Sequence, residues 1–429
     1  MSKGRIDPLN LEAEGLTLPS TPGGIPNPSY GGRSIANIAA SLLRAHGVTP
    51  GRRPILPALA ASLDPFRGRP AQGTTVVFLV DGLGWLGYPD WVGAGGSSIP
   101  DGWRSGRPLT TVFPSTTAAA LASLSTGTAP GAHGIVGYHQ FLPRFGVVAN
   151  MLRMSPVGED RPESLVGPKF RPSMICGSPT LFRRGLGGTA LSHRAFEGTG
   201  FTRAIYDGAE YVSHLTAADL ALCLGEILER PRPPPVVFAY WSELDSGLHR
   251  RGTSVELLRL EMDRLADLLR YVSGHLAPRL RERTTLLVTG DHGMVPCRPS
   301  SQIDISREPT ILRELDRPLA GDRRAGFFRA KRGRGSALLK ALERRLPPGA
   351  RVIATEEALG WGLFGPAPFH PELRERIGDM IVLVRSPSGL TQSPRRRAHR
   401  HREPEGAHGG LEAGELLVPL ISGRFSEFG

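Results

Sequence analysis

Four short runs of apolar residues most strongly limit the folds that are open to this 429-residue chain. They are TTVVFLV at 74–80, the end of PRPPPVVFAYW at 231–241, TTLLVTG at 284–290 and DMIVLVR at 379–385. These runs are continuous and rich in β-branched residues, without the apolar–polar alternation of a half-exposed strand. Each is therefore typical of a strand that is buried on both faces, as in a parallel sheet.

Helical patterns accompany these runs. SIANIAASLLRAHG at 34–47 has apolar residues at helical spacing, and 254–272 has them at 255, 258, 262, 265, 269 and 272. Strands that alternate with helices predict an α/β fold with a mostly parallel sheet. Residues 141–233 interrupt the alternation, because Gly, Pro and Arg are dense there. We interpret them as an insertion or cap between core segments at about 70–140 and 234–429.

Composition narrows the class of protein. A net charge of +12 is compatible with three classes of partner: nucleic acid, anionic lipid and small phosphorylated molecules. The charge alone does not distinguish among them. The start, MSKGRIDPLN, has no apolar core of a signal peptide, and no apolar run is long enough to span a membrane. Cys176, Cys223 and Cys297 belong to no motif, which favours inert thiols in a reducing compartment. We therefore expect a cytoplasmic protein with no membrane attachment.

Acidic and histidine residues follow the predicted strands or stand in glycine-rich turns. They are Asp81, Asp245, His249, Asp291, His292 and His408. Taken singly, an Asp after a strand is often a turn or cap residue, and an Asp and a His four residues apart on a helix are often solvated neighbours. However, the carboxyl ends of parallel strands gather at one edge of the sheet, where these side chains can meet. Three carboxylates and three imidazoles form a ligand set for two zinc-like ions.

The stretch TVFPSTTAAALASLSTG at 111–127 predicts a turn followed by a helix of small residues. In a structural interpretation, the Thr116 hydroxyl caps the helix by accepting bonds from free N–H groups. In a catalytic interpretation, a hydroxyl at this position meets a phosphoryl group held at the helix N-terminus and acts as a nucleophile. The stretch alone does not decide whether Thr116, Thr117 or neither reacts.

Six motifs in this order resemble the alkaline phosphatase superfamily, and they look most like its nucleotide pyrophosphatase/phosphodiesterase branch. The motifs are VDGLGW, FPSTTAAALASLSTG, HGIVGY, ELDSGLHRRG, TGDHGM and GAHGG. The resemblance covers about 70–140 and 234–420. It implies one catalytic domain over 1–429, built as a three-layer α/β/α sandwich with an inserted cap. It also implies a metal-dependent hydrolase that cleaves phosphodiester or pyrophosphate bonds of a small phosphorylated substrate such as a nucleotide.

The resemblance also assigns the metal ligands. One ion is bound by Asp245, His249 and His408. The other is bound by Asp81, Asp291 and His292, and it also holds the oxygen of the nucleophile. Zn²⁺ is the expected ion, with Mn²⁺ as the other candidate, and no organic cofactor is needed.

The register of the family motif selects between the two threonines. In the family, the nucleophile stands ten residues before the glycine that closes the following helix. Here that glycine is Gly127, so the match is Thr117, and Thr116 is left as the helix cap. The implied reaction passes through a phosphothreonine intermediate, with the backbone N–H of Ala118 facing the phosphoryl oxygens.

Substrate contacts are where the chain departs from the family. An Asn of the HGI block that holds a phosphate oxygen in the phosphodiesterase branch is replaced by Tyr138. No equivalent of the phosphate-gripping Arg of classical phosphomonoesterases is visible. We therefore expect diesters to be preferred, with Phe113 and Trp85 lining the space for the second substituent. A phosphomonoesterase acting on a small metabolite is the alternative.

A basic nucleic-acid-binding protein on a catalytically silent fold is the remote alternative. The complete ligand set argues against it, and apart from 393–402 the basic residues are scattered with little aromatic interleaving. We therefore expect no specific nucleic acid partner. The basic segment 393–406 is either a solvated loop or an electropositive rim for an anionic substrate.

Overall fold

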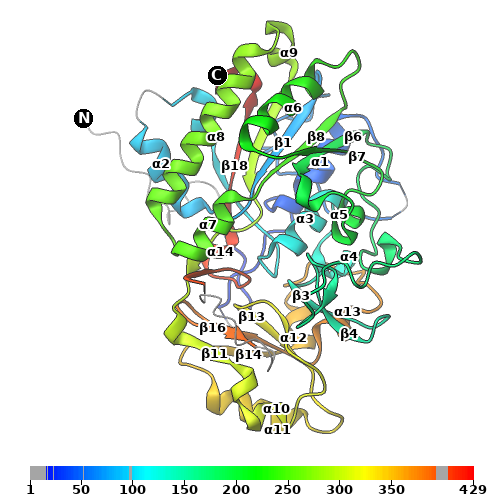
Figure 1. The fold of residues 1–429 in the computed structure, drawn as a ribbon, viewed down its shortest axis with the longest axis vertical. Helices are drawn as coiled ribbons and strands as arrows, with labels where there is room; N and C mark the ends of the chain where they lie inside the picture. The colour runs from blue at the N-terminus through cyan, green and yellow to red at the C-terminus, as the bar shows by residue number, and fades with distance from the viewer. Residues whose placement is uncertain (1–15, 17, 23, 52, 96–98, 393–403) are drawn as a thin grey trace.

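The computed structural model describes residues 16, 18–22, 24–51, 53–95, 99–392 and 404–429. Two seven-stranded sheets organise these residues, and we name them the core sheet and the second sheet. In Figure 1 the core sheet lies in the upper half of the molecule and the second sheet in the lower half. The predicted basic segment 393–402 lies outside the described residues.

The core sheet is mostly parallel. Its strand order is β2-β18-β9-β1-β8-β6-β7, in which β18 alone runs antiparallel to its neighbours. The three central strands are apolar runs that the sequence predicted: β1 (Thr75–Val80), β8 (Val236–Trp241) and β9 (Thr285–Gly290). The others are β2 (Arg107–Thr110), β18 (Leu417–Arg424), β6 (Gly188–His193) and β7 (Glu210–His214).

Helices cover both faces of the core sheet, so the predicted three-layer α/β/α sandwich is confirmed (Figure 1). Val77 and Leu79 of β1 pack in one apolar cluster with α1 (Ile38–Ala45), α3 (Thr117–Thr126) and α5 (Gly200–Ile205). The alternate residues of β1 pack in another cluster, on the opposite face, with α2 (Tyr88–Ala94), α6 (Ala217–Glu229) and α8 (Val255–His275). Because both faces of β1 are covered, its sequence is apolar throughout.

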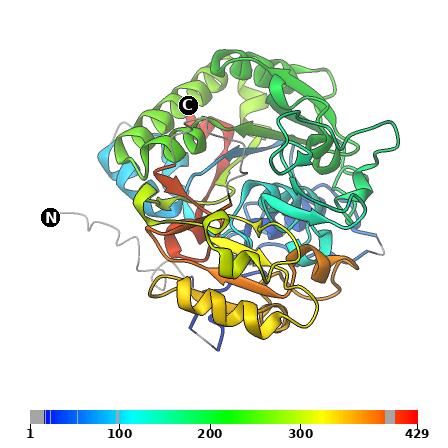
Figure 2. The same cartoon turned by 60° about the horizontal axis from the view of Figure 1, so that its bottom comes forward.

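The second sheet is antiparallel. Its order is β14-β15-β13-β12-β3-β4-β5. The strands are β14 (Arg351–Ala354), β15 (Met380–Leu383), β13 (Ala325–Phe328), β12 (Ala320–Gly321), β3 (His139–Leu142), β4 (Val147–Asn150) and β5 (Ser155–Pro156). One apolar cluster joins it to α12 (Thr355–Gly360) and α13 (Leu373–Ile377), and another joins it to α10 (Pro309–Leu312) and α11 (Gly335–Arg345). Figure 2 shows the lower part of the molecule turned forward, with α11 at its outer surface.

Two expectations differ from the structure. The run at 379–385 is a strand, β15, but it belongs to the second sheet and not to the parallel sheet. Helices also cover both faces of β15, so its sequence resembles a central parallel strand. The predicted insertion 141–233 is divided: its beginning supplies β4 and β5, whereas β6, β7, α5 and α6 complete the core sandwich.

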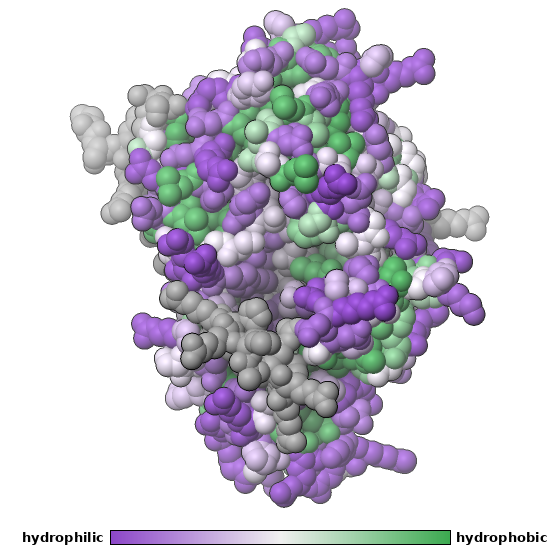
Figure 3. All heavy atoms as spheres, viewed as in Figure 1, coloured by the Kyte–Doolittle hydropathy of each residue, from purple (hydrophilic) through white to green (hydrophobic). Residues whose placement is uncertain are grey.

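The face in Figure 3 is mostly hydrophilic, with smaller apolar areas between the polar side chains. Exposed large apolar residues occur on α6 and α8, for example Leu222 and Leu260. Among the described residues, no helix combines the length and the hydrophobicity that a membrane span requires.

Candidate active site

The core sheet brings all six predicted ligands together at its carboxyl edge. Asp81 follows β1, and Asp291 and His292 follow β9. Asp245 and His249 lie one turn apart on α7 (Glu243–Arg251), which begins just after β8. His408 follows β17 (Gly406–Ala407), a short strand paired with β10 (Val295–Pro296).

The six side chains form two groups. We name Asp245, His249 and His408 the first cluster, and Asp81, Asp291 and His292 the second cluster. Within each cluster the potential ligand atoms all lie within 4.8 Å of one another. The clusters adjoin, since the rings of His292 and His408 stack with centroids 3.6 Å apart.

A tight turn after β1 makes this proximity possible. Gly82 has a φ of +79°, which L-residues other than glycine rarely adopt. Its N–H donates to Asp291 Oδ1 at 3.0 Å. A Cβ at this position would lie 3.0 Å from the Cα of Asp245. The turn therefore depends on glycine and holds the end of β1 against both neighbouring elements.

Each carboxylate of the site leaves one oxygen without a hydrogen bond. Tyr240 donates its hydroxyl to Asp81 Oδ2, and the backbone N–H groups of Gly82 and His292 donate to Asp291 Oδ1. Asp81 Oδ1, Asp245 Oδ1 and Asp291 Oδ2 are buried and have no hydrogen-bond partner among the described residues. A buried acceptor without a partner is costly, so these three oxygens are suited to bind a cation.

The histidines are held in one tautomer. The Nδ1 atoms of His249, His292 and His408 lie 2.9, 3.0 and 2.9 Å from the backbone carbonyls of Gly406, Gly293 and Ser115. A carbonyl only accepts, so each Nδ1 carries the proton and each Nε2 presents a lone pair. The Nε2 atoms of His249 and His408 face each other at 3.2 Å. Two lone pairs at this distance repel each other, and a cation between them or nearby would remove the repulsion.

The distances fit tetrahedral coordination. His292 Nε2 lies 3.4 Å from both Asp81 Oδ1 and Asp291 Oδ2. In the first cluster, Asp245 Oδ1 lies 3.5 Å from His249 Nε2 and 3.9 Å from His408 Nε2. Tetrahedral ligands about 2.0–2.2 Å from a zinc ion are separated by about 3.3–3.6 Å. Both clusters therefore have donor types and spacings suited to a divalent ion.

The electrostatics also favour a cation. Burial raises the pKa of Asp81 well above its usual value, and the charges of Asp291 and Asp245 raise it further. Burial likewise raises the pKa of Asp245. Burial lowers the pKa of His408 well below its usual value, and the nearby His292 and His249 lower it further. A neutral His408 imidazole beside buried carboxylates is a protonation pattern that suits a metal site.

The two threonines differ in environment. Thr117 is the first residue of α3, and its Oγ1 lies 3.2 Å from His292 Nε2, to which it donates. Thr116 holds the N-cap position of α3 with extended backbone, but its side chain makes no capping bond. Its hydroxyl is buried and has no hydrogen-bond partner among the described residues. Burial raises the pKa of the nearby Asp322, and the Thr116 hydroxyl opposes this rise. The predicted capping role of the Thr116 hydroxyl is therefore wrong.

Ala118 is the second residue of α3, in the turn whose N–H groups have no acceptor within the helix.

A cavity of about 790 Å³ opens beside both the first cluster and Thr117. Tyr138 lines it, as predicted for a substrate contact. The sequence did not single out His139, Asp322 and Arg323, which also line it. His139 directly follows the HGIVGY motif, and the GDRR sequence at 321–324 belongs to no recognised motif. Asp322 and Arg323 reach the site only because they lie in the hairpin of β12 and β13.

Two expected lining residues lie elsewhere. Trp85 is 2% exposed and stacks near Tyr88 in the core, and Phe113 is fully buried against Phe364. Neither contributes to the cavity. The apolar part of the wall comes instead from residues around the second sheet, among them Leu152, Leu319 and Leu390.

Comparison with known proteins identifies the family of the chain. A family model described as type I phosphodiesterase/nucleotide pyrophosphatase matches residues 75–411. The structure of murine ectonucleotide pyrophosphatase/phosphodiesterase 5 is similar, with a TM-score of 0.58 and 18% identity over 81% of this chain and 87% of that chain. An inactive variant of the same protein in complex with AMP gives a TM-score of 0.57 and 17% identity over 81% of this chain and 87% of that chain.

A further similar structure is phosphonoacetate hydrolase from Sinorhizobium meliloti 1021 in complex with phosphonoacetate. Its TM-score is 0.58, with 18% identity over 83% of this chain and 94% of that chain. No curated protein sequence matches the chain. The segment matched by the family model contains both clusters and Thr117 and makes up most of the chain. The chain therefore belongs to the type I phosphodiesterase/nucleotide pyrophosphatase family of hydrolases.

Proposed function

We propose that the protein hydrolyses phosphodiester or pyrophosphate bonds of small substrates through a phosphothreonine formed on Thr117. One observation carries the proposal: a threonine hydroxyl at a helix N-terminus lies beside His292 of the second cluster and lines the same large cavity as the first cluster, and three carboxylate oxygens of the two clusters have no hydrogen-bond partner among the described residues. Each cluster supplies both carboxylate oxygen and imidazole nitrogen, which are ligand atoms for zinc and manganese.

The first cluster would hold one divalent ion, and the second cluster would hold another together with the Thr117 oxygen. We propose Zn²⁺, with Mn²⁺ as the other candidate. When bound, two such ions polarise the phosphoryl group, lower the pKa of the attacking hydroxyl and water, and stabilise the charge on the leaving oxygen. The free carboxylate oxygens and the Nε2 lone pairs described above support this arrangement.

The residues of the chain would act in two steps. Thr117 Oγ1 forms a bond to phosphorus while the bond from phosphorus to the leaving oxygen breaks, and the hydroxyl proton leaves with the alcohol product, which gives a phosphothreonine. A water oxygen then forms a bond to the same phosphorus while the bond from phosphorus to Thr117 Oγ1 breaks. The phosphate product is released, and a proton from the water restores the Thr117 hydroxyl. The second cluster, whose His292 Nε2 lies 3.2 Å from Thr117 Oγ1, would hold this oxygen in place before attack. The N–H of Ala118 and the other free N–H groups at the start of α3 would bind the phosphoryl oxygens.

The cavity supports a substrate with an organic group attached to the phosphoryl group. Its volume of about 790 Å³ far exceeds that of a phosphate and falls in the range of sites for drug-sized ligands. Tyr138 and His139 stack near each other on its wall, with ring centroids 4.8 Å apart. The similar structures include complexes with AMP and with phosphonoacetate, so a nucleotide is a reasonable candidate substrate.

A specific observation keeps a phosphomonoesterase as the second candidate. Arg323 lines the cavity, and a cation there can serve the dianion of a phosphate monoester. The sequence alone did not reveal this cation.

The three cysteines are free thiols. We retain the cytoplasm as the proposed location, since free thiols are usual there.

Metal-reconstituted protein assayed on two substrates with the same leaving group tests the proposal. We expect a higher kcat/KM for the 4-nitrophenyl diester of a nucleoside 5′-phosphate than for 4-nitrophenyl phosphate. Chelation should abolish both activities. A monoester preference of tenfold, about 1.4 kcal/mol, would establish the phosphomonoesterase instead. Absence of phosphatase and phosphodiesterase activity in protein that retains bound metal would refute both.

A further inference from the structure

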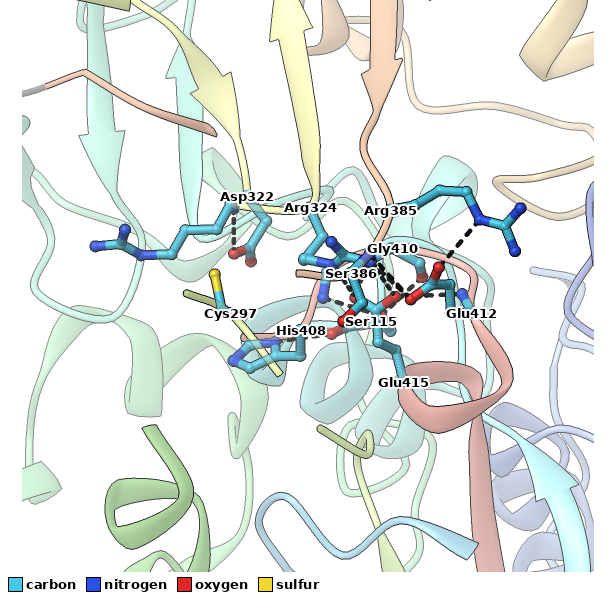
Figure 4. Close-up of polar contacts among 12 residues, drawn as sticks. Ser115, Cys297, Asp322, Arg324, Arg385, Ser386, His408, Gly410, Glu412 and Glu415 are labelled. Carbon is cyan, nitrogen blue, oxygen red and sulfur yellow. Dashed lines mark hydrogen bonds and ion pairs between the residues drawn. The ribbon is translucent and has the colours of Figure 1, made fainter. Parts of the chain in front are cut away.

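A buried ion-pair network lies behind the first cluster (Figure 4). Arg324 directly precedes β13 in the second sheet, and its side chain is fully buried. Its Nε lies 3.1 Å from Glu415 Oε1, its Nη2 lies 2.9 Å from Glu412 Oε2, and its Nη1 donates to the carbonyl of Ser388 at 2.6 Å. Glu415 is also fully buried, and both glutamates belong to the start of α14 (Ala413–Leu416).

The network extends to His408 through the loop between them. Glu415 Oε1 accepts a hydrogen bond from the N–H of Gly410 at 2.9 Å. The hydroxyl of Ser115 donates to the carbonyl of Gly410 at 2.8 Å and accepts from the N–H of Gly409 at 3.1 Å. The carbonyl of Ser115 accepts from His408 Nδ1. Figure 4 shows His408, Ser115 and Gly410 beside the two glutamates and Arg324.

Stability alone does not explain such a network. Two charges are costly to bury, and an apolar pair of similar volume is often as stable or more stable. What the network does provide is a fixed position for the loop that follows His408. It joins the second sheet to the two peptide groups that follow His408, and through Ser115 to the start of the nucleophile helix.

The second cluster is reached by the network only through the backbone. The carbonyl of Glu415 accepts from the N–H of Gly293, next to His292, at 2.9 Å, and a substitution of the Glu415 side chain retains this bond. The carboxylates of the second cluster are held by Tyr240, by Gly82 and by the backbone of His292, all within or next to the core sheet. Among the described residues, the side chains of Arg324 and Glu415 thus support the loop after His408 and not the second cluster.

We infer that Arg324 and Glu415 are positioning residues that hold His408 in its metal-binding orientation, so that the second sheet sets the affinity of the first cluster alone. This inference rests on the proposed metal sites. Residues that orient a ligand in this way typically change metal affinity by about 10–100-fold when they are replaced.

Metal-free protein titrated with Co²⁺, followed by visible absorption and by calorimetry, provides the test. We expect two sites in the wild type. In the Arg324→Met, Glu415→Leu double variant, which replaces both charges with apolar groups, one site should weaken by about 10–100-fold and the other should not change. Glu415→Gln, which keeps the shape of the side chain, should weaken the same site to a smaller extent. His408→Ala identifies that site, and combining it with the double variant should produce no further loss.

A matched control is available in α13. Arg376 is also fully buried, pairs with Glu372 at 2.8 Å and donates to the carbonyls of Gly134 and Ile175, and none of its polar partners in the described part of the chain belongs to either cluster. The Arg376→Met, Glu372→Leu double variant should therefore keep both Co²⁺ affinities. Unchanged Co²⁺ affinities in a folded Arg324→Met, Glu415→Leu protein, or equal weakening of both sites, would overturn the inference alone. A wild type that binds no Co²⁺ would overturn the proposed function as well.

Discussion

Thr116 and Thr117 are neighbours in sequence, but their hydroxyl groups face different partners. Thr117 Oγ1 lies beside His292, whereas the Thr116 hydroxyl faces Asp322. Thr117→Ala should lower kcat by at least about 10³-fold, because the nucleophile is lost. Its bound metal, measured by elemental analysis, should be nearly unchanged.

Thr116→Ala is the matched variant. It should keep kcat within a few-fold and change the free energy of unfolding by less than about 1 kcal/mol, because the Thr116 hydroxyl makes neither a capping bond nor another hydrogen bond among the described residues. An inactive Thr116→Ala protein beside an active Thr117→Ala protein would show that the register of the motif had been misassigned.

Gly82 offers a second prediction at this scale. Gly82→Ala forces a Cβ into the left-handed region and within 3.0 Å of the Asp245 Cα. Gly51 has a similar φ of +80°, but nothing lies within 4 Å of its added Cβ. Gly51→Ala should therefore cost only the backbone strain, about 1–2 kcal/mol. Gly82→Ala should unfold at lower denaturant concentration than Gly51→Ala and lose activity. Equal denaturation midpoints in the two variants would contradict the close approach.

Among the elements, the sequence pattern identified strands that are buried along nearly their whole length and a helix with one buried face. The central strands β1, β8 and β9 are of the first kind, the amphipathic α8 is of the second, and all of them were predicted. The sequence could not show which sheet β15 joins, because a strand covered on both faces looks the same in either sheet. β6 and β7 were missed because their sequences, GTALSH and EYVSH, are not continuous apolar runs, and β7 is an edge strand whose residues are mostly exposed or half-buried.

Acid should act on the junction between α3 and α4 (Pro130–His133). His133 is fully buried, with Nε2 2.9 Å from Ser123 Oγ, and its Nδ1 accepts from the N–H of Ile135. Burial lowers the pKa of His133 from 6.5 to about 3, with help from His370 and Arg376. The unfolded chain thus binds more protons than the folded chain between these two pH values. Stability is therefore complete above pH 6.5 and falls as the pH drops towards 3.

This contribution can be isolated with His133→Gln, whose side chain does not titrate. From pH 7 to pH 5 the wild type should lose about 2 kcal/mol more unfolding free energy than the variant. Denaturant unfolding in the presence of a chelator measures this difference without a contribution from metal release. Parallel pH profiles for the two proteins would refute the assignment.

At the scale of the whole molecule, metal binding should contribute to stability. An ion present at 1,000 times its dissociation constant stabilises the folded state by about 4 kcal/mol. In metal-free protein, the raised pKa values of Asp81 and Asp245 mean that the folded state loses stability as the pH rises through them. A bound cation removes this penalty.

The stabilisation by Zn²⁺ or Mn²⁺ should therefore increase as the pH rises. Thermal unfolding of chelated and reconstituted protein at several pH values measures the effect, and His408→Ala should show a smaller increment than the wild type. A melting temperature that is the same with chelator and with metal would contradict both candidate sites.

The sequence predicted the candidate ligands more completely than the cavity around them. The ligands follow strands of a parallel sheet, whose topology brings their ends to one edge, so six residues distant in sequence could be grouped. Asp322 and Arg323 reach the cavity through the β12–β13 hairpin, and no periodicity or spacing rule specifies how a second sheet lies against the first. The misplacement of Trp85 and Phe113 has the same cause.

The division between the two sheets has a consequence for how such an enzyme can diversify. The reactive residues stand on the core sandwich, whereas nearly all other groups lining the cavity come from the segments 138–157 and 306–392 around the second sheet. Substitutions in these segments can change which molecule is accepted while leaving the bond-breaking residues untouched. New substrate specificities can then arise through substitutions in one half of the molecule, provided that the hydrogen bonds that link Arg324 to the loop after His408 are kept.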